Sequence, residues 1–199
     1  MSLNGKVGYH PVVSEIIPPN NEATTPDYEL KNPFISEDVD AILREKGWLS
    51  SEPNEEQQAW CARAAALLGP QSADRAALAQ LLELVFRYEA RAILQTIEAH
   101  VVMSRYAARD VVRQLALLLL EGTDLTTDRF REIIDTSKAA LDIRGRELFH
   151  PLRLALAGRS GEGELDRVIL LLDEASAAGF AVPVKTARER ILEFCSVFG

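Results

Sequence analysis

The 199-residue sequence has only two cysteines and three histidines, which excludes several kinds of chemistry. Cys61 and Cys195 cannot form a disulfide framework, and we expect both to be small core residues rather than nucleophiles. His10, His100 and His150 lie far apart in the sequence and lack the spacing of paired ligands, so we expect no metal site. The sequence has no phosphate-binding loop ending in Gly-Lys-Ser/Thr and no GxGxxG turn after a strand, so we expect no cofactor.

Long apolar segments are also absent. The longest strongly apolar run, Leu115 to Leu120, is far shorter than the ~18 to 20 residues that span a bilayer. The N-terminus shows no apolar signal segment followed by a cleavage site. We therefore expect a cytoplasmic protein that has no membrane partner.

Positive charge is scarce: 22 Lys and Arg residues stand against 30 Asp and Glu residues, a net charge of −8. Such a balance excludes a protein that coats nucleic acid with its whole surface, and we expect no DNA partner. The deficit is uneven, because residues 1–125 carry 11 basic and 18 acidic residues while residues 126–199 carry 11 and 12. Residues 138–159 have a local net charge of +3, so a small directed contact with nucleic acid remains open.

Apolar residues make up 47% of the sequence, enough for a buried core, and they recur at helical spacing. One such stripe begins at Leu78 and continues to Val101, which predicts an unusually long helix or a helix kinked near His100. Thr186 and Glu189 have the spacing of a capping box that begins the last helix. Further helices are expected over about residues 36–47, 53–69, 104–122, 126–141, 146–158 and 164–176. With no strand-like alternation, the sequence predicts an all-α protein, a bundle or cage of about seven to eight helices.

The chain divides into three parts by composition. Residues 1–35 contain five of the nine prolines and are expected to form an extended arm, because proline removes an amide donor and restricts the residue before it. Residues 36–122 are expected to form an acidic helical subdomain. Residues 123–199 are expected to form a second helical subdomain.

Residues 144–159 read RGRELFHPLRLALAGR. This stretch resembles the signature of the C-terminal anticodon-binding region of bacterial glutamyl-tRNA synthetases, which reads roughly K-G-R/K-x-L-F-x-P-L-R-x-A-L-T-G-R. Residues 165–172 are similar to the family's Leu-rich helix and residues 187–192 to its final helix, so the resemblance covers about residues 126–199. Neither the HIGH-like nor the KMSKS-like catalytic motif occurs, and the chain is not expected to activate glutamate by itself.

The resemblance implies a helical cage that holds splayed anticodon bases. By motif, Arg153 matches the family's anticodon-contacting arginine, and Glu162 and Leu165 match positions that line the same pocket. Arginine forks and apolar stacking surfaces suit the recognition of unstacked bases. The candidate tRNA-binding residues are therefore Arg144, Arg146, Arg153, Arg159, Glu162 and Leu165.

Three hypotheses about function follow. The first is a non-catalytic tRNA-binding domain, either the C-terminal part of a glutamate–tRNA ligase or a freestanding paralogue. The second is a protein–protein interaction module that kept the helical fold and lost tRNA binding, which the net charge of −8 and the acidic turn at Glu162, Glu164 and Asp166 favour. The third is an enzyme of an unrelated class, although no group of residues combines a nucleophile, a base and an oxyanion site.

Overall fold

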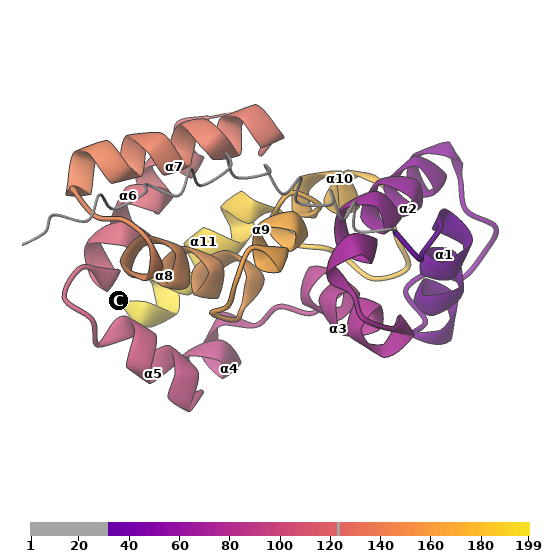
Figure 1. Cartoon of the computed structure of the whole chain (residues 1–199), viewed down its shortest axis with the longest axis horizontal. Coiled ribbons are helices and arrows are strands. Elements are labelled where there is room, and N and C mark those ends of the chain that lie inside the picture. The colour runs from indigo at the N-terminus through magenta and orange to yellow at the C-terminus, as the bar shows by residue number, and fades with distance from the viewer. Residues whose placement is uncertain (1–31, 123) are drawn as a thin grey trace, which may run out of the picture.

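The computed structural model describes residues 32–122 and 124–199, so all but the last few residues of the expected arm lie outside the described part. Within that part the chain is helical and contains no strand, which confirms the all-α prediction (Figure 1). The elements are α1 (Ser36–Glu45), α2 (Glu55–Leu68), the 3-10 turn η1 (Gly69–Gln71), α3 (Arg75–Phe86), α4 (Ala90–Leu94), α5 (Ile97–Met103), α6 (Ala108–Leu120), α7 (Thr127–Leu141), α8 (Arg146–Ala157), α9 (Glu164–Ile169), α10 (Leu172–Ala177) and α11 (Ala187–Phe198).

Helices α1, α2 and α3 lie at one end of the molecule, whereas α4 to α8 and α11 lie at the other, with α9 and α10 between them (Figure 1). An aromatic cluster joins the first group to the C-terminal part of the chain. Trp48 stacks on Phe86 with ring centroids 4.6 Å apart, and Phe180, which follows α10, packs edge-on against Phe86 and Trp60. The core therefore runs through both ends of the molecule.

Helix α6 packs against α7, α8 and α11, and α2 contacts α9 and α10. Contacts thus cross residue 122, where we expect the two helical subdomains to meet, and that division stays a prediction. Thr186 and Glu189 form the expected capping box at the start of α11, with the Thr186 hydroxyl accepting from the Glu189 amide. No helix in residues 32–122 and 124–199 is long and apolar enough to cross a membrane.

The prediction of one long helix from residue 78 to residue 101, or of one kinked near His100, is wrong, because α3, α4 and α5 divide this stretch and α5 runs through His100. Helix α3 ends at Phe86, and Arg87 and Glu89 have extended backbones. Between them, the Tyr88 hydroxyl donates to the carbonyl of Ala155 in α8 at 2.5 Å, a tertiary bond made at the break between the helices. The expected helix over residues 164–176 is likewise divided into α9 and α10, so the helices outnumber the prediction.

A buried arginine fixes the ends of two helices. Arg190 has no exposed surface, and its guanidinium donates to the carbonyls of Val85 at 2.5 Å, Leu84 at 2.9 Å and Leu156 at 2.8 Å. These carbonyls lie in the last turns of α3 and α8, where the helix dipole favours a cation. Burial lowers the pKa of Arg190 to about 10, so its side chain remains charged at neutral pH. Arg190 therefore holds the C-terminal end of the signature helix α8 in place.

Candidate nucleic-acid interface

Helix α8 and the turn after it carry the signature residues. Gly145 begins the helix with a φ of +58°, and Gly158 ends it with a φ of +81°, a conformation that favours glycine. Pro151 lies within α8 and is buried, and the helix continues past it. The turn then runs from residue 158 to residue 163, where α9 follows.

Two side chains hold this turn. Arg153 Nη1 donates to the carbonyl of Gly161 at 2.5 Å, and Glu98 of α5 accepts from both the amide and the hydroxyl of Ser160 at 2.6 Å. Sequence reasoning did not identify Glu98, which lies 62 residues from Ser160. Its position in the first turn of α5 gives no signal of a long-range contact.

Arg153 is engaged within the protein. Its Nε and Nη2 donate to the two carboxylate oxygens of Asp166 at 2.7 and 2.8 Å, and its guanidinium lies 4.8 Å from the ring centroid of Phe149. With the bond to Gly161, all three guanidinium nitrogens donate within the chain. Only 8% of the Arg153 side chain is exposed. The structure thus places Arg153, which the sequence analysis expected to contact the anticodon, in an internal ion pair.

The other candidate residues divide by exposure. Arg144, Arg146, Arg159 and Glu162 are exposed, whereas Leu165 is buried in the core. Arg146 and Glu162 form a long ion pair of 3.8 Å in which both side chains are more than three-quarters exposed. Such a pair contributes little to stability and leaves the Arg146 guanidinium open to other partners.

A further arginine joins this surface from the turn that follows α5. Arg105 Nη1 lies 3.2 Å from His150 Nδ1, which makes Arg105 a neighbour of the signature helix that sequence reasoning missed. Burial lowers the pKa of His150, and the charges of Arg105, Arg146 and Arg153 lower it further, while Glu162 opposes them. Three arginines therefore lie close enough to His150 to disfavour its protonated form.

A surface groove of about 320 Å³, which we call the α7–α9 groove, lies between α7, the middle of α8 and α9. Four of its lining residues are apolar, and we call them the floor of the groove: Phe130, Ile134, Phe149 and Leu170. Arg131, Lys138 and Arg167 also line it, together with the carboxylates of Asp135 and Asp166. None of the six candidate residues lines this groove, although Arg153 contacts two residues that do. Lys138 belongs to the basic segment identified in the sequence; the remaining lining residues gave no comparable signal.

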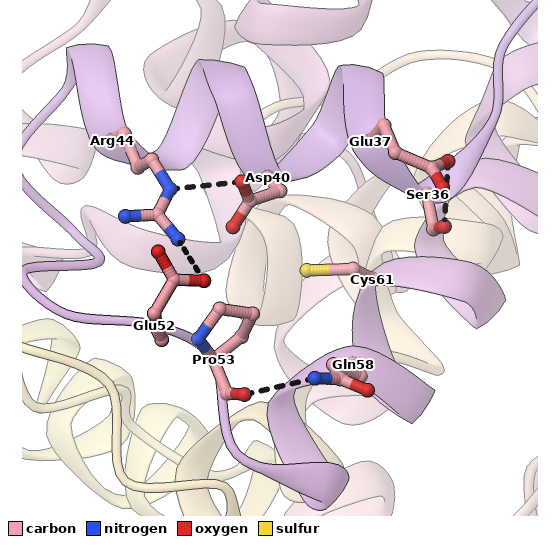
Figure 2. A pocket seen from close by; sticks show the side chains of 8 residues that line it. All are labelled: Ser36, Glu37, Asp40, Arg44, Glu52, Pro53, Gln58 and Cys61. Carbon is pink, nitrogen blue, oxygen red and sulfur yellow. Dashed lines mark hydrogen bonds and ion pairs between the residues drawn. The ribbon is translucent and has the colours of Figure 1, made fainter.

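A second hollow, of about 260 Å³, lies between α1 and α2 (Figure 2). Arg44 bridges Asp40 at 2.8 Å and Glu52 at 3.6 Å on one side, and the Cys61 sulfur points into the space (Figure 2). Burial, followed by the charge of Asp40, raises the pKa of Cys61 to about 12. Cys61 is therefore a buried thiol at neutral pH and not an activated nucleophile. In the described part of the chain, no cluster of His, Cys, Asp and Glu could hold a metal ion.

Comparison with known proteins supports the resemblance seen in the signature. A family model described as an anticodon binding domain matches residues 29–176. This match also takes in residues 29–125, which the signature did not reach. No solved structure matches the chain.

The relatives are glutamate–tRNA ligases. The ligase of Exiguobacterium sibiricum is 28% identical over 131 residues, 66% of this chain and 27% of the ligase, and that of Bacillus subtilis is 26% identical over 141 residues, 68% and 27%. Glutamate–tRNA ligase 2 of Syntrophus aciditrophicus is 32% identical over 79 residues, 40% of this chain and 16% of the ligase. The matched segment thus spans about a quarter of the length of the first two ligases.

Proposed function

The chain belongs to the anticodon binding domain family, and we propose that it binds the single-stranded anticodon loop of a tRNA in the α7–α9 groove. In this proposal the chain acts by binding alone, either as part of a glutamate–tRNA ligase-like protein or as a freestanding paralogue. The bases enter the groove and the exposed arginines of α8 and its flanking turns contact the phosphates.

The composition of the groove is the observation that carries the proposal. Unstacked bases need apolar surface on which to stack, and the neighbouring phosphates need cations. The floor of the groove supplies Phe149 and Ile134, and Lys138 and Arg167 lie beside it. Arg167 is exposed and has no ion pair among the described residues, so its guanidinium can meet a phosphate.

The six candidate residues take different roles in this proposal. Arg144, Arg146 and Arg159 are exposed on the two ends of α8 and are assigned to phosphates. Arg153 is assigned to positioning, because it holds Gly161 and Asp166 rather than facing solvent. Leu165 is buried and is assigned to supporting the turn. The carboxylate of Glu162 is assigned to repelling phosphates that approach its neighbour Arg146.

Fluorescence anisotropy with a labelled anticodon stem-loop hairpin tests the proposal. We expect binding at about 50 mM salt that weakens steeply as salt rises, since each neutralised phosphate releases counterions. Replacing Arg167 with Ala should weaken binding and reduce the slope of log K against log salt by about one.

A matched control is Arg75→Ala. Arg75 is the first residue of α3, does not line the groove, and pairs with Glu45 of α1 at 2.6 Å. Its removal makes the same change in net charge and should leave hairpin binding nearly unchanged. Absence of hairpin binding at about 50 mM salt, with the protein folded, would contradict the proposal.

A second function, protein binding, is favoured by an acidic groove on another part of the surface. Two adjoining hollows of about 460 and 410 Å³ share Arg63, Glu174 and Ala177 and lie between α2, α10 and the start of α7. Trp60, Ala59 and Ala178 supply apolar lining. The carboxylates that line the two hollows are those of Glu56, Asp124, Asp128, Asp173 and Glu174. Such a groove suits a basic segment of a partner protein.

Charge reversal separates the two functions. A stoichiometric protein partner that binds the natural chain and is lost from Glu56→Lys and Asp128→Lys, while hairpin binding is kept, would establish the second function. Hairpin binding with no partner that responds to these substitutions would leave tRNA binding as the function of the chain.

A further inference from the structure

The ion pair between Arg153 and Asp166 presents its two members unequally to the surface. The Arg153 side chain is 8% exposed and does not line the α7–α9 groove, whereas the Asp166 side chain is 22% exposed and does. A molecule in the groove therefore meets the carboxylate of Asp166 and not the guanidinium of Arg153. The polar group at this wall is a hydrogen-bond acceptor.

The carboxylate has acceptor capacity to spare. Each oxygen of Asp166 accepts one hydrogen bond from Arg153, and an ionised carboxylate offers about four acceptor positions in all. The bidentate pair with Arg153 also fixes the orientation of the carboxylate, because a planar guanidinium fork and a carboxylate match in one geometry. Asp166 thus offers fixed, unfilled acceptor positions beside the apolar floor.

We infer that Asp166 selects the base held in the α7–α9 groove, favouring bases with an exocyclic amino group over uracil. Cytosine, adenine and guanine each carry such a donor, and uracil presents carbonyl oxygens in its place. A carboxylate accepts a hydrogen bond from the amino group, whereas the N3–H of uracil lies between two carbonyl oxygens that repel the carboxylate. This inference rests on the proposed function, since it assigns a base preference to the same groove.

The surrounding residues fit a nucleotide placed in this way. Phe149 and Leu170 lie on the floor, where the face of a base can pack. Arg167 directly follows Asp166 in α9, so a base at the carboxylate has a cation close to its own backbone. The base edge and the phosphate then meet groups of opposite charge on one helix.

Binding of two labelled pentanucleotides, oligocytidine and oligouridine, tests the inference. The two ligands have equal charge and nearly equal size, so the phosphate contacts cancel in the ratio of their dissociation constants. We expect oligocytidine to bind about tenfold more tightly, the effect of one hydrogen bond to a charged acceptor. Asp166→Asn should bring the ratio close to one, because an amide can donate to O4 as well as accept from N4.

Asp135→Asn is the matched control. Asp135 lines the same groove from α7 and pairs with Lys138 at 3.1 Å, so its replacement removes the same charge. Both pentanucleotides should bind somewhat more tightly to this variant, with their ratio unchanged. A preference abolished by Asp135→Asn and kept by Asp166→Asn would overturn the assignment to Asp166.

A second measurement leaves the protein untouched. A pentanucleotide of N4,N4-dimethylcytidine lacks the N4–H donor and should bind no more tightly than oligouridine. This test remains valid even if Asp166→Asn fails to fold. A natural chain that binds the hairpin but does not prefer oligocytidine overturns the base assignment alone. A folded chain that binds neither the hairpin nor the pentanucleotides overturns the proposed function and the base assignment together.

Discussion

The guanidinium carbon of Arg190 lies 4.6 Å from the ring centroid of Tyr88, and the ring covers a cation that has no exposed surface. The hydroxyl of the same Tyr88 donates a hydrogen bond to the carbonyl of Ala155 in α8. The two side chains thus connect the segment between α3 and α4 with α8 and α11. No carboxylate among the described residues forms an ion pair with Arg190; backbone carbonyls and the aromatic face stabilise its charge.

Replacing Arg190 with Met should destabilise the protein by about 3 kcal/mol or more, because buried carbonyls of α3 and α8 lose their donors. The free energy of unfolding in urea measures the effect. Arg188→Met is the control: Arg188 is exposed in the same helix, and its replacement should change stability by no more than about 0.5 kcal/mol. Equal effects of the two substitutions would contradict the conclusion that Arg190 holds the ends of α3 and α8 in place.

The fold was predictable where local signals decide it. Helices α1, α2, α7 and α8 begin and end near the expected residues, and α11 begins at the expected capping box, because capping residues such as Thr186 and glycines such as Gly158 act within one turn. The break after Phe86 was not predictable, since the apolar stripe continues through it. There Tyr88 bonds to a residue 67 positions away, and that tertiary contact outweighs local helical periodicity.

The turn after α8 offers a test with two glycines. Gly158 has a φ of +81°, and a Cβ there would lie 3.1 Å from Ile93 Cδ1. Gly158→Ala should therefore destabilise the protein by about 1–2 kcal/mol. Gly163, with a φ of −65° and nothing within 4 Å of an added Cβ, is the control, and Gly163→Ala should be neutral or raise stability by up to about 1 kcal/mol. Thermal unfolding followed by circular dichroism distinguishes these outcomes.

The candidate site was predictable only in part. The signature in residues 144–159 led to the family, because a motif records which residue types a site needs, and the place of the site on α8 stays a prediction. It could not indicate that Arg153 would be engaged by Asp166, since a sequence does not give the direction of a side chain. Arg105 and Glu98 were missed for a related reason: Glu98 lies in α5 and Arg105 just after it, and both reach α8 and its turn only through tertiary packing.

Arg153 and Arg146 lie two turns apart in α8 and should differ sharply in their effect on stability. Arg153→Lys loses the fork that bonds both oxygens of Asp166 and the carbonyl of Gly161, so we expect a loss of about 2 kcal/mol. Arg146→Lys alters an exposed pair of 3.8 Å and should change stability by less than about 0.5 kcal/mol. Urea unfolding of both variants checks the difference, and a neutral Arg153→Lys would show that the ion pair with Asp166 is not formed in solution.

His150 should make stability depend on pH near neutrality. Because burial and the charges of Arg105, Arg146 and Arg153 lower its pKa below 6.5, the unfolded chain binds a proton before the folded protein does. The contribution of His150 to the free energy of unfolding is therefore full above pH 6.5 and is lost as pH falls from 6.5 through the pKa of the folded state.

Other groups also titrate as pH falls, so the test of the His150 contribution compares the natural protein with His150→Gln. The melting temperature of the natural protein should fall more between pH 7.5 and pH 5 than that of His150→Gln. A smaller fall in the natural protein than in His150→Gln would mean that the imidazole gains a proton on folding, against the positive potential of its three arginine neighbours.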